Sequence, residues 1–297
     1  MIDLAALAGL RAVAEHGSVG AAAEATGFTP SAVSQQVKRL ERQLGVPLLE
    51  RVGRGVMLTG QGRHLVDGGT QVLADLEELE AGIRHRSGVV AGEVRLVAFS
   101  TAMRGLVAPV ARELLDKYAD LRLALQEREP WDTVDMVAGG HCDVGIVHRW
   151  GGVAFAVPEH VVTTRVAEDV ADLIVPHDHP LAQRRSVTPH DLVDVDWIAT
   201  PENTICRQWL HRMFDGTGRP PRIAHVSMEF ESHLALVASG LGVALVPRLG
   251  RAPLGPDLAA VAVRDPEPVR IVDALHRRTM TDSPAVAAVL EALRSTG

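Results

Sequence analysis

The segment covering residues 18–44 constrains the fold of this chain more than any other. It reads SVGAAAEATGFTPSAVSQQVKRLERQL. The side chains of its alanine-rich first half are small enough for a second helix to approach closely, and Gly27 gives the backbone the freedom for a tight turn. Thr29 offers an N-cap hydroxyl, and Pro30 suits the first position of a helix, where no N–H is needed. We therefore predict two helices joined by a short turn.

The second of these helices, at residues 30–44, has two different faces. Apolar residues at spacings of four, three and four form the face expected to pack inward: Val33, Val37, Leu40 and Leu44. The opposite face is polar near the helix start and basic further on: Ser31, Ser34, Gln35, Lys38, Arg39 and Arg42. Hydroxyls and amides can bond to base edges in a DNA major groove, and cations can contact phosphates. The alternative is a surface helix with a solvated charged face, but the combined features favour DNA recognition.

Charge is distributed unevenly along the chain. Its 297 residues correspond to about two domains. The formal net charge of −7 excludes a uniformly basic nucleic-acid-binding protein, but residues 1–64 hold seven Lys and Arg side chains against five Asp and Glu. A local basic surface on an acidic body can hold DNA and still limit non-specific binding.

The two cysteines, Cys142 and Cys206, allow no disulfide framework and no CxxC metal spacing. We therefore expect a protein of the reducing cytoplasm. Charged residues at positions 3, 11 and 15 interrupt the apolar N-terminus, which is not typical of a signal peptide. No apolar run approaches the ~18 residues that span a membrane, so no membrane partner is expected.

Further elements surround the helix pair. A stripe of Leu4, Leu7 and Leu10 predicts a preceding helix, which makes residues 3–44 a three-helix unit. Short strands at 48–51 and 56–58 would follow as a hairpin. Three helices and a hairpin make a winged helix-turn-helix, with Arg51 and Arg54 on the wing near DNA phosphates.

A long helix is expected from Thr59 onward. Its apolar residues fall on heptad a and d positions, with Gly69 at the remaining position of the seam: Leu65, Val72, Leu76, Leu79 and Ile83. This spacing predicts a short coiled-coil seam. An amphipathic helix packed on its own domain is the alternative, but the narrow apolar stripe favours a dimer, which would present two recognition helices to two half-sites.

Beyond a linker at residues 87–92 the pattern changes to alternating strands and helices. Strands are expected at 92–100, 122–127, 142–147, 172–175, 240–246 and 269–275, and helices at 106–118, 133–139, 204–214, 231–239 and 284–295. This alternation predicts a parallel sheet in an α/β domain.

Several motifs together resemble the LysR-type transcriptional regulators. The family pattern LExxLGxxLFxR, followed by LTxxG, is matched by Leu40, Glu41, Leu44, Gly45, Leu48, Leu49 (usually Phe), Arg51, Leu58, Thr59 and Gly62. The segments HPLA at 179–182 and GLGVALVP at 240–247 are similar to landmarks of the family's effector domain. The resemblance spans nearly the whole chain and is most specific over the first 65 residues.

The resemblance implies an α plus α/β architecture in three parts. Residues 1–60 would be the winged helix-turn-helix DNA-binding domain, and 61–91 the linker helix and hinge. Residues 92–297 would be a periplasmic-binding-protein-like effector domain. Its lobe one would cover 92–163 and 266–297 and its lobe two 166–262, with crossings near 163–166 and 262–265. Family members are usually homotetramers that bind interrupted palindromes in double-stranded DNA.

Residue roles follow from the resemblance. Ser31, Ser34 and Gln35 would approach bases, while Thr29, Lys38, Arg39, Arg51 and Arg54 would approach phosphates, with Arg42 on the same basic face. Position 35 is often Arg in the family, and Gln35 would favour adenine over guanine. The usual Gln-Pro before the helix is Pro30-Ser31 here, so the family's base preference does not transfer directly.

The effector is expected between the lobes, at strand ends and helix N-termini. The candidate contacts are Ser100, Thr101, His148, Trp150, Thr200, Asn203, Thr204, Met228 and Glu229. Hydroxyls and free N–H groups at such places can hold an anion, although hydroxyls before helices are often caps alone. A small, anionic metabolite is therefore the expected effector.

Other chemistries find little support. His141 and His148 are seven residues apart, ~23 Å on an extended strand, so they cannot share one metal ion. Redox sensing by Cys142 or Cys206 is not favoured, because both lie in apolar or helical patterns. No catalytic constellation and no cofactor motif is found.

The sequence thus predicts a ligand-responsive transcription regulator rather than an enzyme, with RNA polymerase as a candidate partner. The rival is a cytosolic solute-binding or enzymatic α/β protein whose N-terminal helices only mediate oligomerisation. The polar-then-basic face of residues 31–42 argues against that rival.

Overall fold

The computed structural model describes residues 2–52, 55–153 and 155–296. Contacts group the chain into two compact units. The first holds residues 1–89 with the short segments 139–141 and 277–284, and the second holds the rest.

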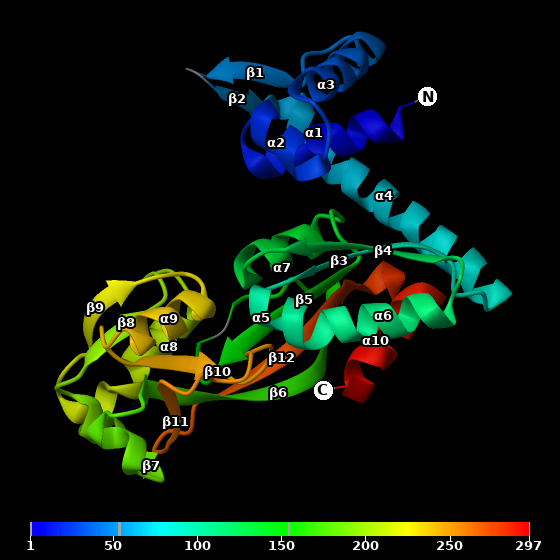
Figure 1. Ribbon diagram of the computed structural model, residues 1–297. Coiled ribbons are helices and arrows are strands. Elements are labelled where there is room, and N and C mark those ends of the chain that lie inside the picture. Colours follow the sequence, from blue (N-terminus) through cyan, green and yellow to red (C-terminus); the bar gives the residue numbers. More distant parts are fainter. Residues whose placement is uncertain (1, 53–54, 154, 297) are drawn as a thin grey trace. The chain divides into compact units, whose positions relative to one another are not determined.

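The N-terminal unit has the predicted helices and hairpin. Its elements are α1 (Leu4–His16), α2 (Val19–Thr26), α3 (Pro30–Leu44), β1 (Leu49–Val52), β2 (Gly55–Leu58) and α4 (Gly60–Ser87). β1 and β2 pair antiparallel and form the wing (Figure 1). Arg54, one of the two predicted wing cations, lies outside the described residues.

Two apolar clusters hold the first three helices together. One joins α1, α2 and α3 through Ala12, Val13, Ala22, Ala23 and Val33. The other joins α1 and α3 to the wing through Ala6, Leu10, Val37, Leu40 and Leu48. Because the residues on α2 are alanines, this helix can lie close to its neighbours. The apolar face of α3 predicted at Val33, Val37 and Leu40 is buried, whereas Leu44 is 38% exposed.

The linker helix α4 divides into two parts. Near its start Gly69 faces α1, and a Cβ at this position would meet Leu7 Cδ1 at 2.6 Å. Leu65 is also partly buried against the α1–α3 cluster. Further along, Leu79 and Ile83 are 60% and 63% exposed. Packing on its own domain, the weaker alternative in the sequence, therefore describes one side of the first part of α4, while Val72, Leu79 and Ile83 leave apolar surface exposed along the helix.

The α/β part of the chain contains one large sheet with helices around it. Its elements are β3 (Gly92–Ala98), α5 (Ser100–Ala102), η1 (Met103–Val107), α6 (Ala108–Lys117), β4 (Leu121–Glu127), α7 (Pro130–Ala138), β5 (Val144–Trp150), β6 (Val161–Pro176), η2 (Pro180–Gln183), β7 (Ser186–Val187), η3 (Pro189–Leu192), β8 (Asp196–Ala199), α8 (Ile205–Met213), η4 (Asp215–Thr217), β9 (Arg222–Val226), α9 (Phe230–Ala238), β10 (Ala244–Pro247), β11 (Leu258–Val263), β12 (Val269–Arg277), η5 (Arg278–Met280) and α10 (Pro284–Thr296).

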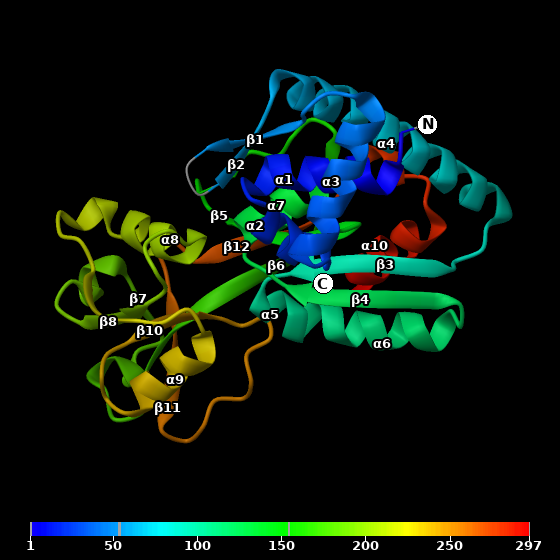
Figure 2. The same ribbon diagram turned by 90° about the horizontal axis from the view of Figure 1, so that it is seen from above.

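These elements form two lobes joined by a long strand. The sheet order is β4-β3-β5-β12-β6-β11-β7, with β10 also paired to β6. Lobe one contains β3 to β5 with α5 to α7 and α10, and lobe two contains β7 to β11 with α8 and α9 (Figure 1, Figure 2). The second half of β6 pairs with β10 and β11 in lobe two. β6 therefore carries the chain from one lobe into the other.

The structure corrects three expectations about this domain. β3 pairs parallel with β4 and β5, but β12 is antiparallel to β5, and β6 is antiparallel to β10 and β11, so the sheet is mixed rather than parallel. The helix expected from residue 106 begins at Ser100 and contains a π-helical turn at Met103–Val107. The strand expected at 142–147 is shifted to 144–150, so His148 and Trp150 lie within β5 instead of following it.

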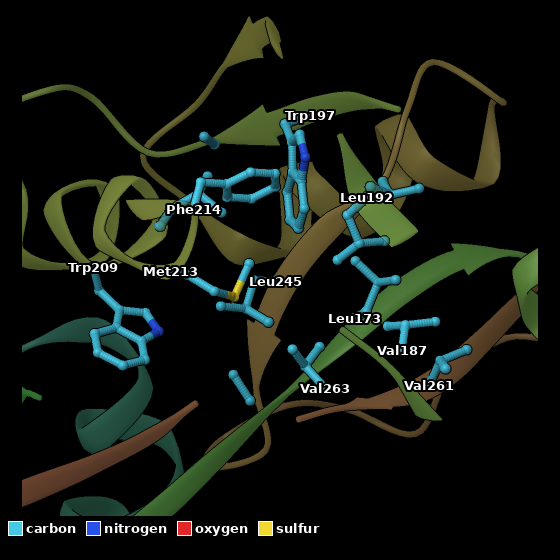
Figure 3. Packing of buried hydrophobic residues seen from close by; sticks show 14 of the residues in the cluster. Leu173, Val187, Leu192, Trp197, Trp209, Met213, Phe214, Leu245, Val261 and Val263 are labelled. Atoms are coloured by element: carbon cyan, nitrogen blue, oxygen red, sulfur yellow. The ribbon is translucent and has the colours of Figure 1, made fainter. Parts of the chain in front are cut away.

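Lobe two has an aromatic core. Trp197 and Phe214 meet edge to face with ring centroids 5.9 Å apart, and Leu173, Leu192 and Leu245 pack around them (Figure 3). The same cluster includes Trp150 from β5. Trp150 stacks on Trp209 with centroids 5.9 Å apart, so a lobe-one strand contributes to the core of lobe two.

Candidate DNA-binding surface and effector site

Helix α3 is fixed at both ends by local chemistry. Thr29 Oγ1 accepts a hydrogen bond from Ala32 N at 3.2 Å and caps the helix start. Gly45, with φ +72, ends the helix in the left-handed conformation that favours glycine. With its inner face buried, α3 presents one constant outer face. The hydroxyl of Thr29, predicted to contact phosphate, is thus engaged in capping.

The outer face of α3 carries the predicted base-reading and cationic side chains. Exposed side chains are Ser31, Gln35, Lys38, Arg39 and Arg42, while Ser34 is half-buried. Gln35, Lys38, Arg39 and Arg42 also line a surface hollow of ≈ 560 Å³ that extends to residues 45–47. The side-chain amide of Gln35 therefore lies on the same surface as three cations. A protein that reads base edges and also contacts phosphates needs this combination of groups.

Arg39 already has an anionic partner. Its Nη1 lies 3.1 Å from Asp3 Oδ2, and Asp3 Oδ1 also accepts from Ala5 N at 3.0 Å as the N-cap of α1. Arg39 thus connects α3 to the start of α1, a contact that sequence reasoning missed. Arg42 donates from Nε to the carbonyl of Lys38 at 3.3 Å. These contacts orient both cations without removing them from solvent.

The family motif residues hold the wing against the helices. Glu41 Oε1 accepts from Leu48 N at 2.9 Å and from Leu49 N at 3.2 Å, which anchors the start of β1. Thr59 Oγ1 donates to the Pro47 carbonyl at 2.8 Å and accepts from Gly62 N at 3.0 Å. Arg51 stands exposed on β1, at the predicted wing position.

On the lobe-one side of the candidate effector site, Thr101 is bonded to a buried arginine. Arg270 Nη2 donates to Thr101 Oγ1 at 2.6 Å, and Arg270 Nε donates to Asp169 Oδ2 at 2.8 Å. Arg270 is 1% exposed and Asp169 5%. The guanidinium also lies 5.1 Å from the centroid of Phe99. Burying a charge of this kind is costly unless it is paired and hydrogen-bonded, and Asp169 and Thr101 supply such partners to Nε and Nη2 of Arg270.

His148 and Trp150 are both buried within β5. His148 packs edge to face on Phe99 with centroids 4.6 Å apart. Burial lowers the pKa of His148 well below its usual value, and the positive charge of Arg270 lowers it further. His148 is therefore neutral and lies behind Phe99. Trp150 lies on the lobe-two side, against Trp209.

On the lobe-two side, Thr200 and Thr204 are brought together. Their Oγ1 atoms are 2.6 Å apart. Thr204 caps α8 by accepting from Arg207 N at 3.2 Å, and Arg207 Nη1 donates to the Thr200 carbonyl at 3.2 Å. The two hydroxyls therefore also stabilise the start of α8.

Of the remaining candidates, Asn203 and Glu229 contact residues of lobe one. Trp131 Nε1 on α7 donates to the Asn203 carbonyl at 3.2 Å. Arg104 on the π-helical turn reaches Glu229 at 4.0 Å and donates from Nε to the Gly250 carbonyl at 3.2 Å. Met228 is exposed and Ser100 is half-buried. Asn203 and Glu229 thus participate in lobe–lobe contacts.

Sequence reasoning missed several residues of this region. Arg270 and Asp169 form a buried ion pair, but both lie in strands that contain further charged residues, so the sequence alone did not single them out. Burial raises the pKa of Glu129, and the nearby Glu229 raises it further. His233 on α9 was not singled out at all, because one histidine in a helix carries no distinctive pattern.

The thiol of Cys206 is not activated. Burial raises its pKa to about 12, so the neutral thiol is the form present near neutral pH. Cys142 is fully buried. The burial of Cys142 agrees with its interpretation as a small apolar residue.

Comparison with known families decides the identity. Residues 4–63 match the family model described as bacterial regulatory helix-turn-helix protein, lysR family, and residues 87–297 match the LysR substrate binding domain. The chain belongs to the LysR family of transcriptional regulators.

Relatives of this LysR-type regulator span most of its length. A probable RuBisCO transcriptional regulator of Synechocystis sp. is 30% identical over 240 residues, 80% of this chain and 69% of the relative. A small neutral protease regulatory protein of Streptomyces coelicolor is 30% identical over 303 residues, 98% of this chain and 86% of the relative. The family and these relatives are transcriptional regulators, not enzymes, which excludes the rival enzymatic interpretation.

Solved structures share the fold of this LysR-type regulator. A full-length OxyR variant from Pseudomonas aeruginosa aligns with a TM-score of 0.71 at 23% identity, covering 99% of this chain and 98% of that one. CbnR in complex with its target DNA aligns with a TM-score of 0.58 at 22% identity, covering 99% and 100%. Within the described part of the chain, no helix is long and apolar enough to cross a membrane.

Proposed function

We propose that this LysR-type regulator reads its operator with the outer face of α3 and that a small molecule held between the two lobes modulates its output. The observation that carries the first part is the fixed orientation of α3. Its apolar face is buried while Gln35 and three cations share one exposed surface. Such a face supplies base-edge contacts from the amide and salt-dependent phosphate contacts from the cations.

The test is fluorescence anisotropy of the full-length protein on the DNA upstream of its own gene, with random DNA of equal length as control. We expect a preference of orders of magnitude for the upstream DNA and a steep dependence on salt. Gln35→Ala should reduce the difference between the two DNAs by roughly 1–3 kcal/mol. If Gln35→Ala left that difference intact, another residue would read the operator.

The effector part of the proposal rests on where the lobes meet. Thr101 and Arg270 on one side and Thr200 and Thr204 on the other carry buried polar atoms at strand ends and helix starts. A ligand that prefers one arrangement of the lobes shifts the population toward it. Metabolites added to the operator complex in the anisotropy assay would reveal the effector by a change in affinity.

The oligomeric part rests on apolar surface in the N-terminal unit. A groove of ≈ 720 Å³ lies between α1 and the first part of α4, lined by apolar residues that include Leu4, Leu44 and Val72. Leu79 and Ile83 continue the exposed stripe along α4. We propose that a second copy covers these residues to form a dimer, and that two dimers form the tetramer that binds an interrupted palindrome beside RNA polymerase.

A further inference from the structure

A small cavity lies where the end of β5 meets lobe two. Its volume is ≈ 20 Å³. Four residues with polar or sulfur atoms line it, together with apolar side chains: Trp150, Thr200, Cys206 and His233. Trp150 belongs to a strand of lobe one, whereas the other three belong to lobe two. The cavity is therefore enclosed by both lobes.

Two of the lining side chains carry a polar atom without a hydrogen-bond partner among the described residues. These atoms are Trp150 Nε1 and His233 Nδ1. Both side chains are 1% exposed. Buried donors and acceptors are rarely left unpaired in folded proteins, so a bound group is the expected partner.

The hydrogen bonds around the cavity define what each atom can offer. His233 Nε2 lies 2.9 Å from the Ser227 carbonyl, which can only accept, so Nε2 carries the proton and Nδ1 offers a lone pair. Thr204 donates its hydroxyl proton to the Pro201 carbonyl at 2.8 Å, so Thr200 must be the donor in the pair of threonines. Thr200 Oγ1 is then left with acceptor capacity, and the indole N–H of Trp150 is a donor.

This set of groups discriminates between ligands by charge. A carboxylate could accept from Trp150 but would face the lone pairs of His233 and Thr200. An ammonium would meet the indole N–H, and no Asp or Glu is among the residues that line the cavity. A hydroxyl both donates and accepts, and the volume exceeds the ~10–15 Å³ that one water-sized group needs.

We propose that this cavity receives a hydroxyl group of the effector, which accepts from Trp150 Nε1–H and donates to His233 Nδ1. The inference rests on the proposed effector function and names the chemistry of the ligand's buried end, which is an uncharged alcohol instead of the anion expected from sequence. Because Trp150 and His233 come from different lobes, such a hydroxyl binds most tightly when the lobes are in this arrangement. The group that recognises the ligand is then also the group that selects the conformation.

The experiment follows the indole signals of the full-length protein. Labelling tryptophan with ¹⁵N gives one Nε1–H resonance for each of the 4 tryptophans, and Trp150→Phe assigns that of Trp150. The probes are 1-propanol, sodium propionate and propylammonium chloride, which share a carbon chain and differ in the terminal group. We expect a saturable shift of the Trp150 signal with 1-propanol, at a dissociation constant at least tenfold below that of either ion.

Three variants make the test specific. His233→Phe removes the acceptor and should weaken the response to 1-propanol. Thr200→Val removes a hydroxyl without changing the side-chain shape, and it should leave the response in place, because the single proton of the ligand hydroxyl goes to His233 Nδ1. Trp197→Phe is the matched control, because its indole Nε1 is also buried and unpartnered among the described residues, but Trp197 does not line the cavity and its ring contact is with Phe214. This control should keep the full response. A dissociation constant for propionate less than tenfold above that for 1-propanol, no saturable shift with 1-propanol, or an unchanged response in His233→Phe would each overturn the proposal.

Operator binding by the same samples separates this inference from the proposed function. If wild-type protein shows no preference for the upstream DNA, the proposed function fails while the propanol result still decides the chemistry of the cavity. If 1-propanol binds at the cavity and operator affinity does not change with it, the hydroxyl site stands as a binding site and its link to regulation is overturned.

Discussion

Arg39 forms an ion pair with the carboxylate of Asp3, and the same guanidinium is expected to contact DNA phosphates. Asp3→Asn keeps a good N-cap for α1 and removes the negative charge. We expect affinity for random DNA to rise about two- to fivefold at low salt, with a salt slope steeper by roughly one phosphate contact. Anisotropy over a salt series measures both quantities.

A matched control tests whether any lost surface carboxylate has the same effect. Asp116→Asn removes the partner of Arg112 in an exposed ion pair on α6, which belongs to the effector domain. It should leave the slope unchanged. Equal effects of the two substitutions would show that net charge, and not the release of Arg39, governs the binding.

The high pKa of Cys206 predicts a chemically inert thiol. The reactive thiolate is the deprotonated form, which accumulates only as pH approaches the pKa of about 12. At neutral pH the native protein should therefore be alkylated by iodoacetamide far more slowly than the unfolded protein, as followed by mass spectrometry. Rapid modification of Cys206 in the native state would contradict the raised pKa of its thiol and reopen a redox role.

At the scale of elements, the start of α4 requires glycine at position 62, because there is no room for a side chain there. A Cβ at Gly62 would collide with the backbone carbonyl oxygen of Leu48, which itself accepts from Thr59 N at 3.0 Å. Gly62→Ala must push the wing away from the linker helix, and we expect a loss of about 1–3 kcal/mol in the free energy of unfolding, measured with urea.

Gly60→Ala is the control for this prediction, because a Cβ at Gly60 meets nothing within 4 Å. Alanine there should leave stability unchanged or raise it slightly, since glycine is the poorer helix former. If the two variants lost the same stability, a cause common to both positions, and not the contact with Leu48, would explain the effect.

Local patterns predicted the N-terminal elements well, because the helix caps and turns there are determined by residues adjacent in sequence. Thr29 and Pro30 start α3 and Gly45 ends it. The role of Gly69 was different, because nothing near it in sequence indicates that it packs on Leu7. The role of such a residue depends on a contact with a distant segment of the chain, and the periodicity of one helix contains no information about that contact.

The effector domain was harder for the same reason. The antiparallel direction of β12 depends on how the chain returns to lobe one after leaving lobe two, which strand spacing does not encode. Thr101 was found from its place after a strand, whereas its partner Arg270 is separated from it by 169 residues. The threonine pair was predictable because Thr200 and Thr204 are four residues apart around a helix start.

At the scale of the whole molecule, the exposed stripe of α4 predicts an obligatory partner. Introducing two charges with Leu79→Glu and Ile83→Glu should convert the protein to smaller species in analytical ultracentrifugation. Operator affinity should fall by orders of magnitude, because one recognition helix would then bind one half-site alone.

Leu115→Glu is the control for oligomerisation, since Leu115 on α6 is also exposed, at 46%. It should leave both the molecular mass and operator affinity unchanged. If instead it dissociated the protein while the α4 variant did not, the main contact between copies would lie on the effector domain.

The position of Trp150 sets a rule for recombining effector domains among relatives. Its backbone pairs with Arg270 in the sheet of lobe one, while its indole belongs to the core of lobe two. A chimera that exchanges lobe two alone would leave a foreign indole facing the new core, or a hole where one is needed. In such a chimera, the last residue of β5 must therefore come from the same parent as lobe two, which surrounds its side chain. The correct exchange boundary thus differs from the lobe boundary defined by the backbone.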